Sequence, residues 1–442
     1  MTAARRRPDA GVDAVDFASG LVWADVPEHV RRHLAWLLLD FAAVCVAGRA
    51  APASAIAAAY AREVHAAGPC TSLHDGDRLA APGAAWTNGV LANVLDYDDG
   101  HRITKGHPGA IIIPAALAAA EAVDASMVDL LEAIAVGYEL AVRAGTRLHA
   151  TESQYHASAA WGALGAAAAA GRLLGLASAQ LRHAVGLAEY HAPIALMPRA
   201  VADPAMTKDA TGWGAFLGVS SAMLAAGGFT ALESAFLADC DAGAELGSRW
   251  DVLDVYVKAY PCCRWTQPAI EAALRVRDGI DPDAIDRVTV HTFAAADGLS
   301  RRRPATTEDM QYSLIWPVAA ALTHGTFDVT GVLAEFSDAG VERIAGRTAV
   351  VVDPDIDAAF PAQRLTRVVV ESGGARRDSG LVETRGEPRD PSWRVVIEEK
   401  VRRFLDPGLP DGLIPSAHPP DAHLAGRSLA ELLALLTYGR TP

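Results

Sequence analysis

The densest group of titratable side chains in this sequence lies between residues 93 and 107, in the segment NVLDYDDGHRITKGH. Its acids and bases can tune one another's pKa; they are Asp96, Asp98, Asp99, His101, Arg102, Lys105 and His107. Acids and bases crowded between two apolar segments favour proton transfer with a bound substrate. Charged loops are also common on protein surfaces, so the spacing alone leaves a solvated connecting loop as an equal alternative.

Three basic residues each precede a predicted helix. His107 and Pro108 come before an apolar segment, His156 comes before an alanine-rich one, and Lys208 opens a third. The free amides and the dipole of a helix N-terminus favour anions, so the three together could bind a carboxylate. Taken singly, each fits an ordinary capping or surface residue better, and only their convergence in space would indicate a site.

A fourth candidate is the segment KAYPCCRWTQ, which spans Lys258 to Gln267 at a predicted domain junction. Clefts between domains are favoured ligand sites, and Lys258 and Arg264 could supply positive charge to one. A rigid linker containing proline is the structural alternative. No base flanks Cys262 or Cys263, so buried packing is the expected role of both thiols.

Several function classes are disfavoured. His101 and His107 with nearby aspartates match no compact zinc spacing, and no GxGxxG after a strand or GxxxxGK[ST] is present, so we expect neither a metal nor a nucleotide cofactor. The net charge of −14 argues against nucleic acid and anionic membranes as partners. The uncharged stretch Ala210 to Leu232 is interrupted by glycines and predicts a buried helix rather than a membrane span.

The composition also bears on compartment. Five cysteines without metal-ligand spacing indicate reduced thiols in the cytoplasm. Arg5, Arg6 and Arg7 are followed by aspartates where an export signal would need an apolar run, so we expect no export.

The elements that must position these residues are mainly helical. Helical spacing of apolar residues predicts helices at Pro27–Val44, Ala51–Ala67, Ala84–Tyr97, Ile113–Ala122, Met127–Leu148, Ser158–Leu174, Ser178–Tyr190 and Lys208–Ala226. The first 255 residues are therefore expected to form an all-helical first part, and the fold class is mainly α. Alanine is over-represented, which predicts closely packed helices.

The pattern changes after Lys258. β-Branched runs predict strands at Ile285–Phe293, Thr348–Val352 and Arg364–Ser372, with helices at Trp265–Arg277 and Ser313–Thr323 between them. Helical periodicity returns at Ser392–Phe404 and Ser428–Leu436. We therefore expect a smaller α+β lid domain at residues 256–392, inserted into a helical domain formed by residues 1–255 and 393–442.

These motifs, taken in order, resemble those of the MmgE/PrpD family. NVLDYDD followed by GHP resembles the family signature, and LLLDFAAVCVAG resembles its first helix. YHASAAWGALGAAAAAGRLLGL, MTKDATGWGAFLG, VKAYPCCRWTQPAIEAAL and QYSLIWPVAAAL follow in the family's order. Each motif alone is weak, but several in order are difficult to obtain by chance.

The resemblance implies reactions at carbons next to carboxylates, such as 2-methylcitrate dehydration, cis-aconitate decarboxylation and iminodisuccinate epimerisation. It implies no metal or organic cofactor, a homodimer, and a site between a large helical domain and a smaller lid. Carried over motif by motif, the implied catalytic residues are Asp96, His107, His156, Lys208 and Lys258. The expected substrate-binding residues are His101, Arg102, Arg264, Gln267 and Trp316.

The sequence departs from the family pattern at three places. Gly100 stands where decarboxylase-like members carry a threonine, Trp316 where a tyrosine is often found, and Gln267 where a histidine is common. Trp316 cannot act as an acid or a base. His101 and Arg102 add basic character beside the acidic cluster.

The predicted reaction is removal of a proton next to a carboxylate, which requires a base and concentrated positive charge. We place His107 and His156 as acid and base, Asp96 as their orienting partner, and Lys208, Lys258 and Arg102 as the charge. The leading prediction is a dehydratase of a small di- or tricarboxylate, followed by an isomerase or epimerase and then a decarboxylase. From another class, Gly100 and Trp316 favour a catalytically silent carboxylate-binding or structural subunit.

Overall fold

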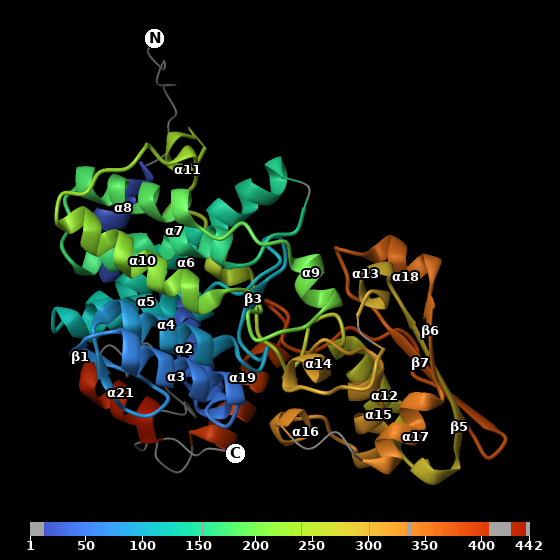
Figure 1. Cartoon of the computed structure of the whole chain (residues 1–442). Helices are drawn as coiled ribbons and strands as arrows, with labels where there is room; N and C mark the ends of the chain where they lie inside the picture. The colour runs from blue at the N-terminus through green and yellow to red at the C-terminus, as the bar shows by residue number, and fades with distance from the viewer. Residues whose placement is uncertain are drawn as a thin grey trace.

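The structure is a computed structural model of the whole chain and describes residues 13–152, 154–239, 241–299, 301–333, 338–405 and 426–438. Figure 1 shows two parts, a larger helical one and a smaller one that carries the four-stranded sheet. The basic residues Arg5 to Arg7, and Cys240, lie outside the described residues. The other four cysteines are free thiols.

The larger part is built from helices, as predicted. They are α1 (Ala14–Gly20), α2 (Glu28–Gly48), α3 (Pro52–Val64), α4 (Ala81–Asn93), α5 (Gly109–Ala122), α6 (Met127–Thr151), α7 (Ala159–Leu173), α8 (Ser178–His191), α9 (Met197–Ala202), α10 (Thr211–Ala226) and α11 (Ala235–Ala238). The predicted helix at Ala84–Tyr97 ends earlier, at Asn93, so the acidic cluster falls in a turn. The helix predicted from Lys208 begins at Thr211, which leaves Lys208 just before the first turn.

Close helix contacts explain the small side chains of this core. A Cβ on Gly165 of α7 would lie 2.3 Å from the carbonyl oxygen of Gly137 on α6, so these two backbones touch. A Cβ on Gly218 of α10 would lie 2.4 Å from the Cβ of Ala166 on α7. Larger residues at these positions would force the helices apart, at a cost of about 1–3 kcal/mol each.

The prediction of an all-helical first part was wrong in detail. It contains the short strand pair β1 (Ala67–Thr71) and β2 (Arg78–Leu79), and β3 (Gly100–His101) pairs with β4 (Val255–Tyr256). These strands are too short to leave a β-branched run in the sequence, which is why periodicity did not reveal them. The β3–β4 pair matters for the site, because it holds the loop after Asp99 against the start of the smaller part.

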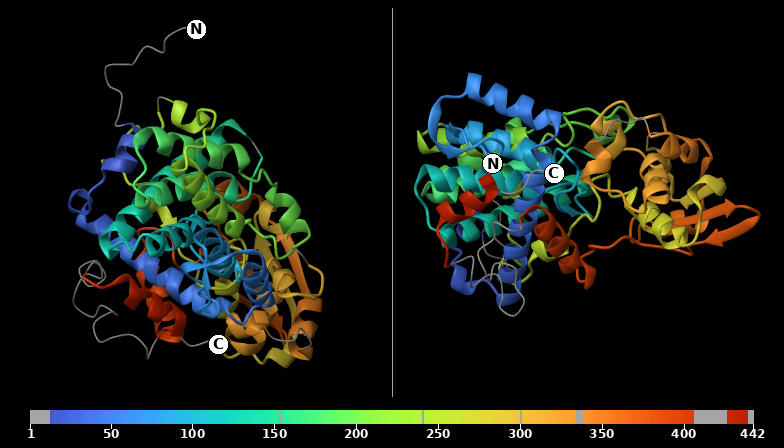
Figure 2. Two further views of the ribbon diagram at one scale, coloured as in Figure 1. Left: turned by 60° about the vertical axis from the view of Figure 1, so that its left-hand side comes forward. Right: turned by 90° about the horizontal axis from the view of Figure 1, so that it is seen from below.

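The smaller part is an α+β unit around one mixed sheet. Its strands are β5 (Ile285–Thr292), β6 (Thr348–Val352), β7 (Arg367–Ser372) and β8 (Ala375–Asp378), in the order β6-β5-β7-β8. β5 is parallel to β6 and antiparallel to β7. The helices are α12 (Gln267–Arg277), α13 (Ala294–Asp297), α14 (Thr307–Gln311), α15 (Ile315–His324), α16 (Val329–Leu333), α17 (Ala339–Gly346) and α18 (Pro354–Ala359). In Figure 2 the β7–β8 hairpin lies at the end farthest from the helical part.

The chain enters and leaves the smaller part at one place. The amide of Val257 donates to the carbonyl of Gly386 at 2.9 Å, so the two connections lie side by side. A Cβ at Gly386 would lie 2.3 Å from the oxygen of Val257, and its φ is +87°, so glycine is required there. The following helices α19 (Ser392–Phe404) and α21 (Leu429–Tyr438) both pack on α2.

Within the described residues, no single helix is long and apolar enough to cross a membrane. Only α2 and α3 together pass that test by length and composition, and they are bent by 92°. Most residues of α2 are buried in the protein core. The segment Ala210–Leu232 forms α10 and the residues that follow it, and one face of α10 is buried.

Candidate active site

A cavity of about 250 Å³ lies where the two parts meet. Its polar lining comes from the acidic loop, from the start of α10 and from the smaller part; it comprises Asp96, Arg102, Lys105, His107, Tyr155, Asp209, Tyr256, Lys258, Cys263, Arg264, Tyr312 and Arg364. Apolar residues complete it, among them Met197, Val201, Trp265 and Phe360. This volume is at the small end of ligand sites, so it suits a small molecule.

Unusual backbone conformations bring the key side chains to this cavity. Asp96 has a φ of 53° after the end of α4, and Lys208 has a φ of 41° before α10. Ala210 follows with a φ of 55°. Non-glycine residues in this left-handed region are uncommon and are concentrated at functional sites, because the surrounding structure must compensate the strain.

Asp96 is the centre of the site and is almost completely buried. Its Oδ1 atom lies 3.0 Å from Nζ of Lys258, 3.7 Å from Nζ of Lys208 and 3.6 Å from Nε2 of His107. Lys258 also donates to the backbone carbonyl of Asp96 at 3.0 Å. Lys208 donates to Oε1 of Gln311 at 2.5 Å, and that amide donates to the carbonyl of Val94 at 3.0 Å.

Burial and charge act in opposite directions on these groups. Burial would raise the pKa of Asp96, but Lys258, Lys208 and His107 hold it well below its usual range. Burial would lower the pKa of Lys258, yet the carboxylates of Asp96 and Asp98 raise it above its usual range. For Lys208 burial prevails, and its pKa is lowered. Lys258 is therefore the firmly charged ammonium of the pair.

The two ring nitrogens of His107 have different partners. Nδ1 lies 2.9 Å from the carbonyl of Asp99 and 3.2 Å from Oδ2 of Asp98. Because a carbonyl only accepts, Nδ1 must carry a proton. Nε2 lies 3.6 Å from Oδ1 of Asp96 and 3.7 Å from Oδ2 of Asp209, beyond hydrogen-bond distance. This nitrogen is thus left to interact with a bound molecule.

The carboxylates around His107 keep it protonated at neutral pH. Burial alone would lower the pKa of His107, but Asp98 and Asp209 outweigh that effect and raise it to about 9. Asp98 itself has a lowered pKa, chiefly because the charge of His107 outweighs burial. The neighbouring carboxyl of Asp99 behaves differently, since burial raises its pKa to about 7 despite a hydrogen bond from Tyr138.

Sequence reasoning missed Asp209, which completes the surroundings of His107. Its Oδ1 accepts hydrogen bonds from the hydroxyl of Ser158 at 2.6 Å and from the amide of Ser158 at 3.1 Å. The same hydroxyl accepts from the amide of His107 at 2.9 Å. Oδ2 of Asp209 is buried and has no hydrogen-bond partner among the residues that the structure describes. Its position next to Lys208 was the available signal, but nothing in the sequence paired it with His107.

A second group of charges lies on the side of the smaller part. Arg264 pairs with Glu387 at 2.9 Å, and Arg102 pairs with Glu387 at 2.7 Å and with Glu383 at 3.2 Å. Both arginines line the cavity, as their predicted role in substrate binding requires, but both are already neutralised by these carboxylates. Lys258 and Arg264 both follow the predicted junction, and both line this cavity.

The structure does not place every predicted residue on the cavity. Five of them line it, namely Asp96, Arg102, His107, Lys258 and Arg264. Lys208 stands behind this lining, with its Nζ atom 3.7 Å from Oδ1 of Asp96. The other predicted residues are buried outside the lining; they are His101, His156, Gln267 and Trp316.

Each of these outlying residues has a describable environment. Nδ1 of His156 is buried without a hydrogen-bond partner in the described part of the chain, while its neighbour Tyr155 lines the cavity. Gln267 accepts a hydrogen bond from Arg264 at 3.0 Å and so supports a lining residue.

Burial, with Arg364 nearby, lowers the pKa of His101 to about 4. Tyr312, which follows α14 and stands four residues before Trp316, lines the cavity and lies under Nζ of Lys208.

Gly100 allows another phenol to approach. A Cβ at Gly100 would lie 2.4 Å from the hydroxyl oxygen of Tyr256, its partner across the β3–β4 pair. Tyr256 lines the cavity, and the Tyr256 ring lies beneath the guanidinium groups of Arg264 and Arg364. The departure at Gly100 thus makes room for the side chain of Tyr256.

Asp96, Asp98 and His107 also offer ligand atoms within 4.8 Å of one another. Oδ1 of Asp96 already faces the ammonium groups of Lys258 and Lys208, which would repel a metal ion. This donor set therefore fits a proton-transfer cluster better than a cation site.

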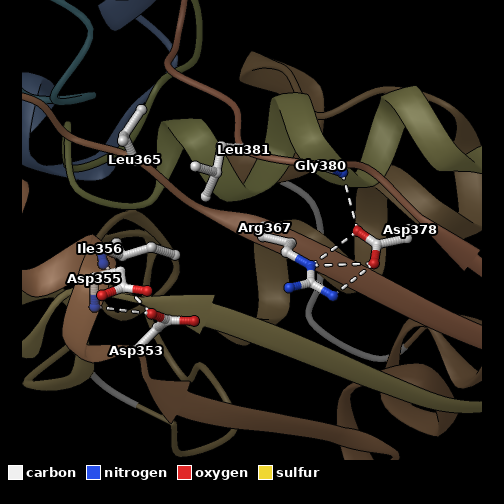
Figure 3. A pocket seen from close by; sticks show the side chains of 8 residues that line it. All are labelled: Asp353, Asp355, Ile356, Leu365, Arg367, Asp378, Gly380 and Leu381. Carbon is white, nitrogen blue, oxygen red and sulfur yellow. Dashed lines mark hydrogen bonds and ion pairs between the residues drawn. The ribbon is translucent and has the colours of Figure 1, made fainter.

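A separate, open depression lies on the smaller part, beside β7 and β8 (Figure 3). Arg367 points to Asp378 there, with a shortest distance of 2.7 Å, and Asp378 also accepts from the amide of Gly380. Its one arginine is neutralised, and its remaining charges are the acids Asp353 and Asp355. It shares no lining residue with the cavity around Asp96.

Fold and site together define a mainly α protein of two parts with a buried cluster of acids and bases between them. The sequence matches the MmgE/PrpD N-terminal domain over residues 13–249 and the MmgE/PrpD C-terminal domain over residues 260–412. The chain belongs to the MmgE/PrpD family, as the resemblance of its motifs predicted.

Three curated relatives are similar to this chain. A cis-aconitate decarboxylase of Aspergillus terreus is 27% identical over 302 residues, which cover 62% of this chain and 61% of that enzyme. The cis-aconitate decarboxylase-like protein oryM of Aspergillus oryzae is 26% identical over 370 residues, or 74% and 76% of the two chains. Human cis-aconitate decarboxylase is 37% identical over 126 residues, or 26% and 25%.

Proposed function

We propose that this protein is a lyase that needs no cofactor and eliminates water from a small di- or tricarboxylate after removal of the proton next to a carboxylate. Family membership and the relatives support chemistry on polycarboxylates in general. The observation that carries the dehydration proposal is the position of Nε2 of His107, which lies between two carboxylate oxygens without bonding to either. An acid and a base side by side are what elimination requires.

The acid in this proposal is His107. Its raised pKa, about 9, keeps the ring protonated at neutral pH, and its Nδ1 is anchored by Asp98 and by the carbonyl of Asp99. The proton on Nε2 is then the one that is transferred. Elimination needs such a proton, because hydroxide leaves readily only as water.

The base in this proposal is Asp209. Asp209 lines the cavity, and its buried Oδ2 atom has no hydrogen bond among the described residues, while Ser158 fixes the other oxygen. Fixed carboxylates act as bases on carbon acids in other enzymes. His156, which we predicted as one member of the acid–base pair, lies outside the cavity lining, so the geometry favours Asp209 for this role.

The lysines supply the positive charge. Removal of a proton beside a carboxylate builds up negative charge on the carboxylate oxygens, and fixed cations stabilise it. Lys258 lines the cavity and is held charged, and Lys208 adds its charge behind Asp96. Asp96 orients both ammonium groups, because its Oδ1 atom faces both.

The proposed step balances. Asp209 takes the proton, the C–H electron pair forms the double bond, the C–O bond breaks, and His107 protonates the departing hydroxide to give water. Asp209 is then protonated and His107 neutral. Oδ2 and Nε2 are 3.7 Å apart, so the proton has a short return path that resets the site. A substrate without a leaving group would instead be reprotonated, which gives isomerisation or epimerisation.

Decarboxylation is the second candidate, and the names of the relatives favour it. In that reaction the bond to a carboxylate breaks, carbon dioxide leaves, and the electron pair on carbon takes a proton from His107. No base is needed, so the role of Asp209 distinguishes the two reactions.

The test is proton NMR of the purified protein in deuterated water with citrate, methylcitrate, cis-aconitate, itaconate, malate and iminodisuccinate. We expect loss of water from a hydroxy acid and deuterium next to a carboxylate. Conversion of cis-aconitate to a product that has lost one carboxylate as carbon dioxide, without deuterium exchange in the remaining substrate, would support decarboxylation. A folded protein that leaves every acid unchanged would support the catalytically silent subunit.

Asp209→Asn separates the two reactions. We expect it to reduce dehydration about a thousandfold, since the base is lost, and Asp203→Asn is the matched control. Asp203 precedes the same segment but its side chain is 88% exposed. Full activity of Asp209→Asn would remove Asp209 from the mechanism.

The homodimer implied by the family resemblance is also a proposal for this chain. Aromatic side chains from α3, α4 and α10 gather on one face, where Tyr60 contacts Trp86 and Trp86 contacts Trp213. Trp213 is 52% exposed, and Phe216 extends the group along α10. Partly exposed aromatic clusters mark interaction surfaces, and we propose that a second copy of this chain covers this one.

A further inference from the structure

Arg364 is the one arginine of the cavity that is buried without an ion pair among the described residues. Its side chain is 4% exposed, and neither Nε nor Nη1 has a hydrogen-bond partner. Burying a guanidinium costs free energy unless its donors are satisfied. Arg102 and Arg264, which line the same cavity, are both paired with Glu387.

The arginines around this part of the cavity outnumber the carboxylates that meet them. On this side of the cavity the described cations are Arg102, Arg264 and Arg364, and the carboxylates that meet them are Glu383 and Glu387. Glu387 feels all three arginines, which lower its pKa to about 2 against the effect of burial. Glu383 contacts Arg102 through its side chain and the backbone amide, not the guanidinium, of Arg364.

The charges around Asp96 are balanced, and the remaining cation of the lining, Lys105, is only half-buried and lies over the ring of Tyr155. His107, Lys208 and Lys258 face Asp96, Asp98 and Asp209 there, so the cations are matched by carboxylates. A substrate carboxylate next to the reacting carbon therefore meets positive charge that is already shared. The unshared guanidinium of Arg364 lies elsewhere on the wall, on the segment from the smaller part.

The ring of Tyr256 packs against this guanidinium. The Arg364 guanidinium carbon lies 5.2 Å from the centroid of the Tyr256 ring, and that of Arg264 lies 4.7 Å from it. A guanidinium over an aromatic face can still donate hydrogen bonds within its own plane, including to a carboxylate. The unpaired donors Nε and Nη1 lie on different edges of the group, so each is left for a separate hydrogen bond.

We propose that Arg364 is the anchor for a second carboxylate of the substrate, one remote from the reacting carbon. This inference rests on the proposed function, because it names the feature that the substrate must have. It predicts that the site selects di- and tricarboxylates over monocarboxylates. Arg364 was not among the site residues predicted from the sequence, which gave it only as the first residue of the predicted strand Arg364–Ser372; that strand begins at Arg367.

The test uses three unreactive acids, butyrate, glutarate and tricarballylate, which carry one, two and three carboxylates on the same propane chain. Isothermal titration calorimetry measures the Kd of each. With wild-type protein we expect tricarballylate and glutarate to bind more tightly than butyrate. Arg364→Gln is expected to raise the Kd of tricarballylate about 30-fold and that of butyrate less than about 2-fold. Arg364→Lys is expected to fall between, since an ammonium keeps the charge but not the planar set of donors.

Two controls exclude a structural role. Arg367→Gln changes an arginine of the same segment that is paired with Asp378 outside the cavity, and we expect no change in any Kd. Arg364→Gln should keep or raise the Tm of the unliganded protein, because it removes a buried charge whose donors are unsatisfied. A lower Tm together with equal loss of all three acids would assign Arg364 to folding.

The remaining outcomes separate this inference from the proposed function. Binding of tricarballylate that is unaffected by Arg364→Gln would overturn the inference, as would failure of the wild-type protein to bind it. If binding depends on Arg364 in a protein that neither dehydrates nor exchanges any acid, the role of Arg364 as a carboxylate anchor stands and the proposed lyase activity is rejected.

Discussion

Nδ1 of His107 lies 3.2 Å from Oδ2 of Asp98, and both side chains are buried. The carboxylate favours the charged ring strongly enough to overcome burial, and it accounts, together with Asp209, for the raised pKa of about 9. The ring is therefore an acid at neutral pH and not a base. This relationship determines which direction of proton transfer His107 can perform.

The first prediction concerns pH. The folded pKa of His107 lies above the ordinary value of about 6.5, so its contribution to stability is fully present below that value and is lost as pH rises through about 9. Dehydration should likewise fall as pH rises through about 9. Asp98→Asn should move that alkaline limb toward neutral pH, measured as kcat/KM against pH. A limb that stays in place in this variant would exclude His107 as its origin.

A second prediction concerns turnover. His107→Ala removes the acid and Lys208→Ala removes charge beside Asp96, so each should reduce kcat at least about a hundredfold without loss of fold. His324→Ala is the matched control, because His324 is exposed at the end of α15 and pairs with Asp338. His156→Ala should cost less than His107→Ala, since His156 lies outside the cavity lining. Unchanged kcat in both His107→Ala and Lys208→Ala would contradict the assignment of this cavity as the active site.

Much of this site was visible in the sequence because its residues cluster along the chain. The segment of residues 93–107 supplies Asp96 and His107, and ordinary helix periodicity located α5 and α10, which start next to His107 and Lys208. The predicted strand Ile285–Phe293 corresponds to β5 within one residue, because alternating β-branched residues mark it.

The other contributors come from distant segments that only the fold brings together. Ser158 hydrogen-bonds to both His107 and Asp209, each of which is 51 residues away from it in the sequence. Arg102 bonds to the carbonyl of Ala362 across 260 residues, which brings the segment before β7 to the cavity. Pairwise contacts of this kind leave no periodic trace, so Asp209 and Arg364 could not be selected by their spacing.

A third prediction tests Gly100. Alanine there would place a Cβ 2.4 Å from the hydroxyl of Tyr256, so Gly100→Ala should destabilise the protein by about 1–3 kcal/mol and disturb the cavity wall. Gly100→Ala combined with Tyr256→Val should be less destabilised than the sum of the two single variants, because the clash is removed. Urea unfolding of the four proteins measures this coupling. Additive effects would show that the two residues do not compete for space.

A fourth prediction tests the buried pair of Lys400 and Asp40. Nζ of Lys400 lies 2.7 Å from Oδ1 of Asp40 and donates to the carbonyl of Tyr97 at 2.8 Å, next to Asp96. Lys400→Met leaves Asp40 buried alone and should cost about 3–5 kcal/mol in the free energy of unfolding. Asp40→Leu with Lys400→Met should recover much of that stability. The double variant should still lose turnover if Lys400 positions the loop of Asp96, and full activity would deny it that role.

The last prediction concerns the aromatic face on α3, α4 and α10. If a second copy covers it, Trp213→Glu should introduce a buried charge at the interface and shift the protein from dimer to monomer. Light scattering coupled to size-exclusion chromatography measures the mass, and Val395→Glu is the control, because Val395 is 43% exposed on α19, which packs on α2. The monomer should stay folded, since Trp213 is half exposed in the single chain. A wild-type protein that is already monomeric, or a Trp213→Glu dimer, would exclude this face as the interface.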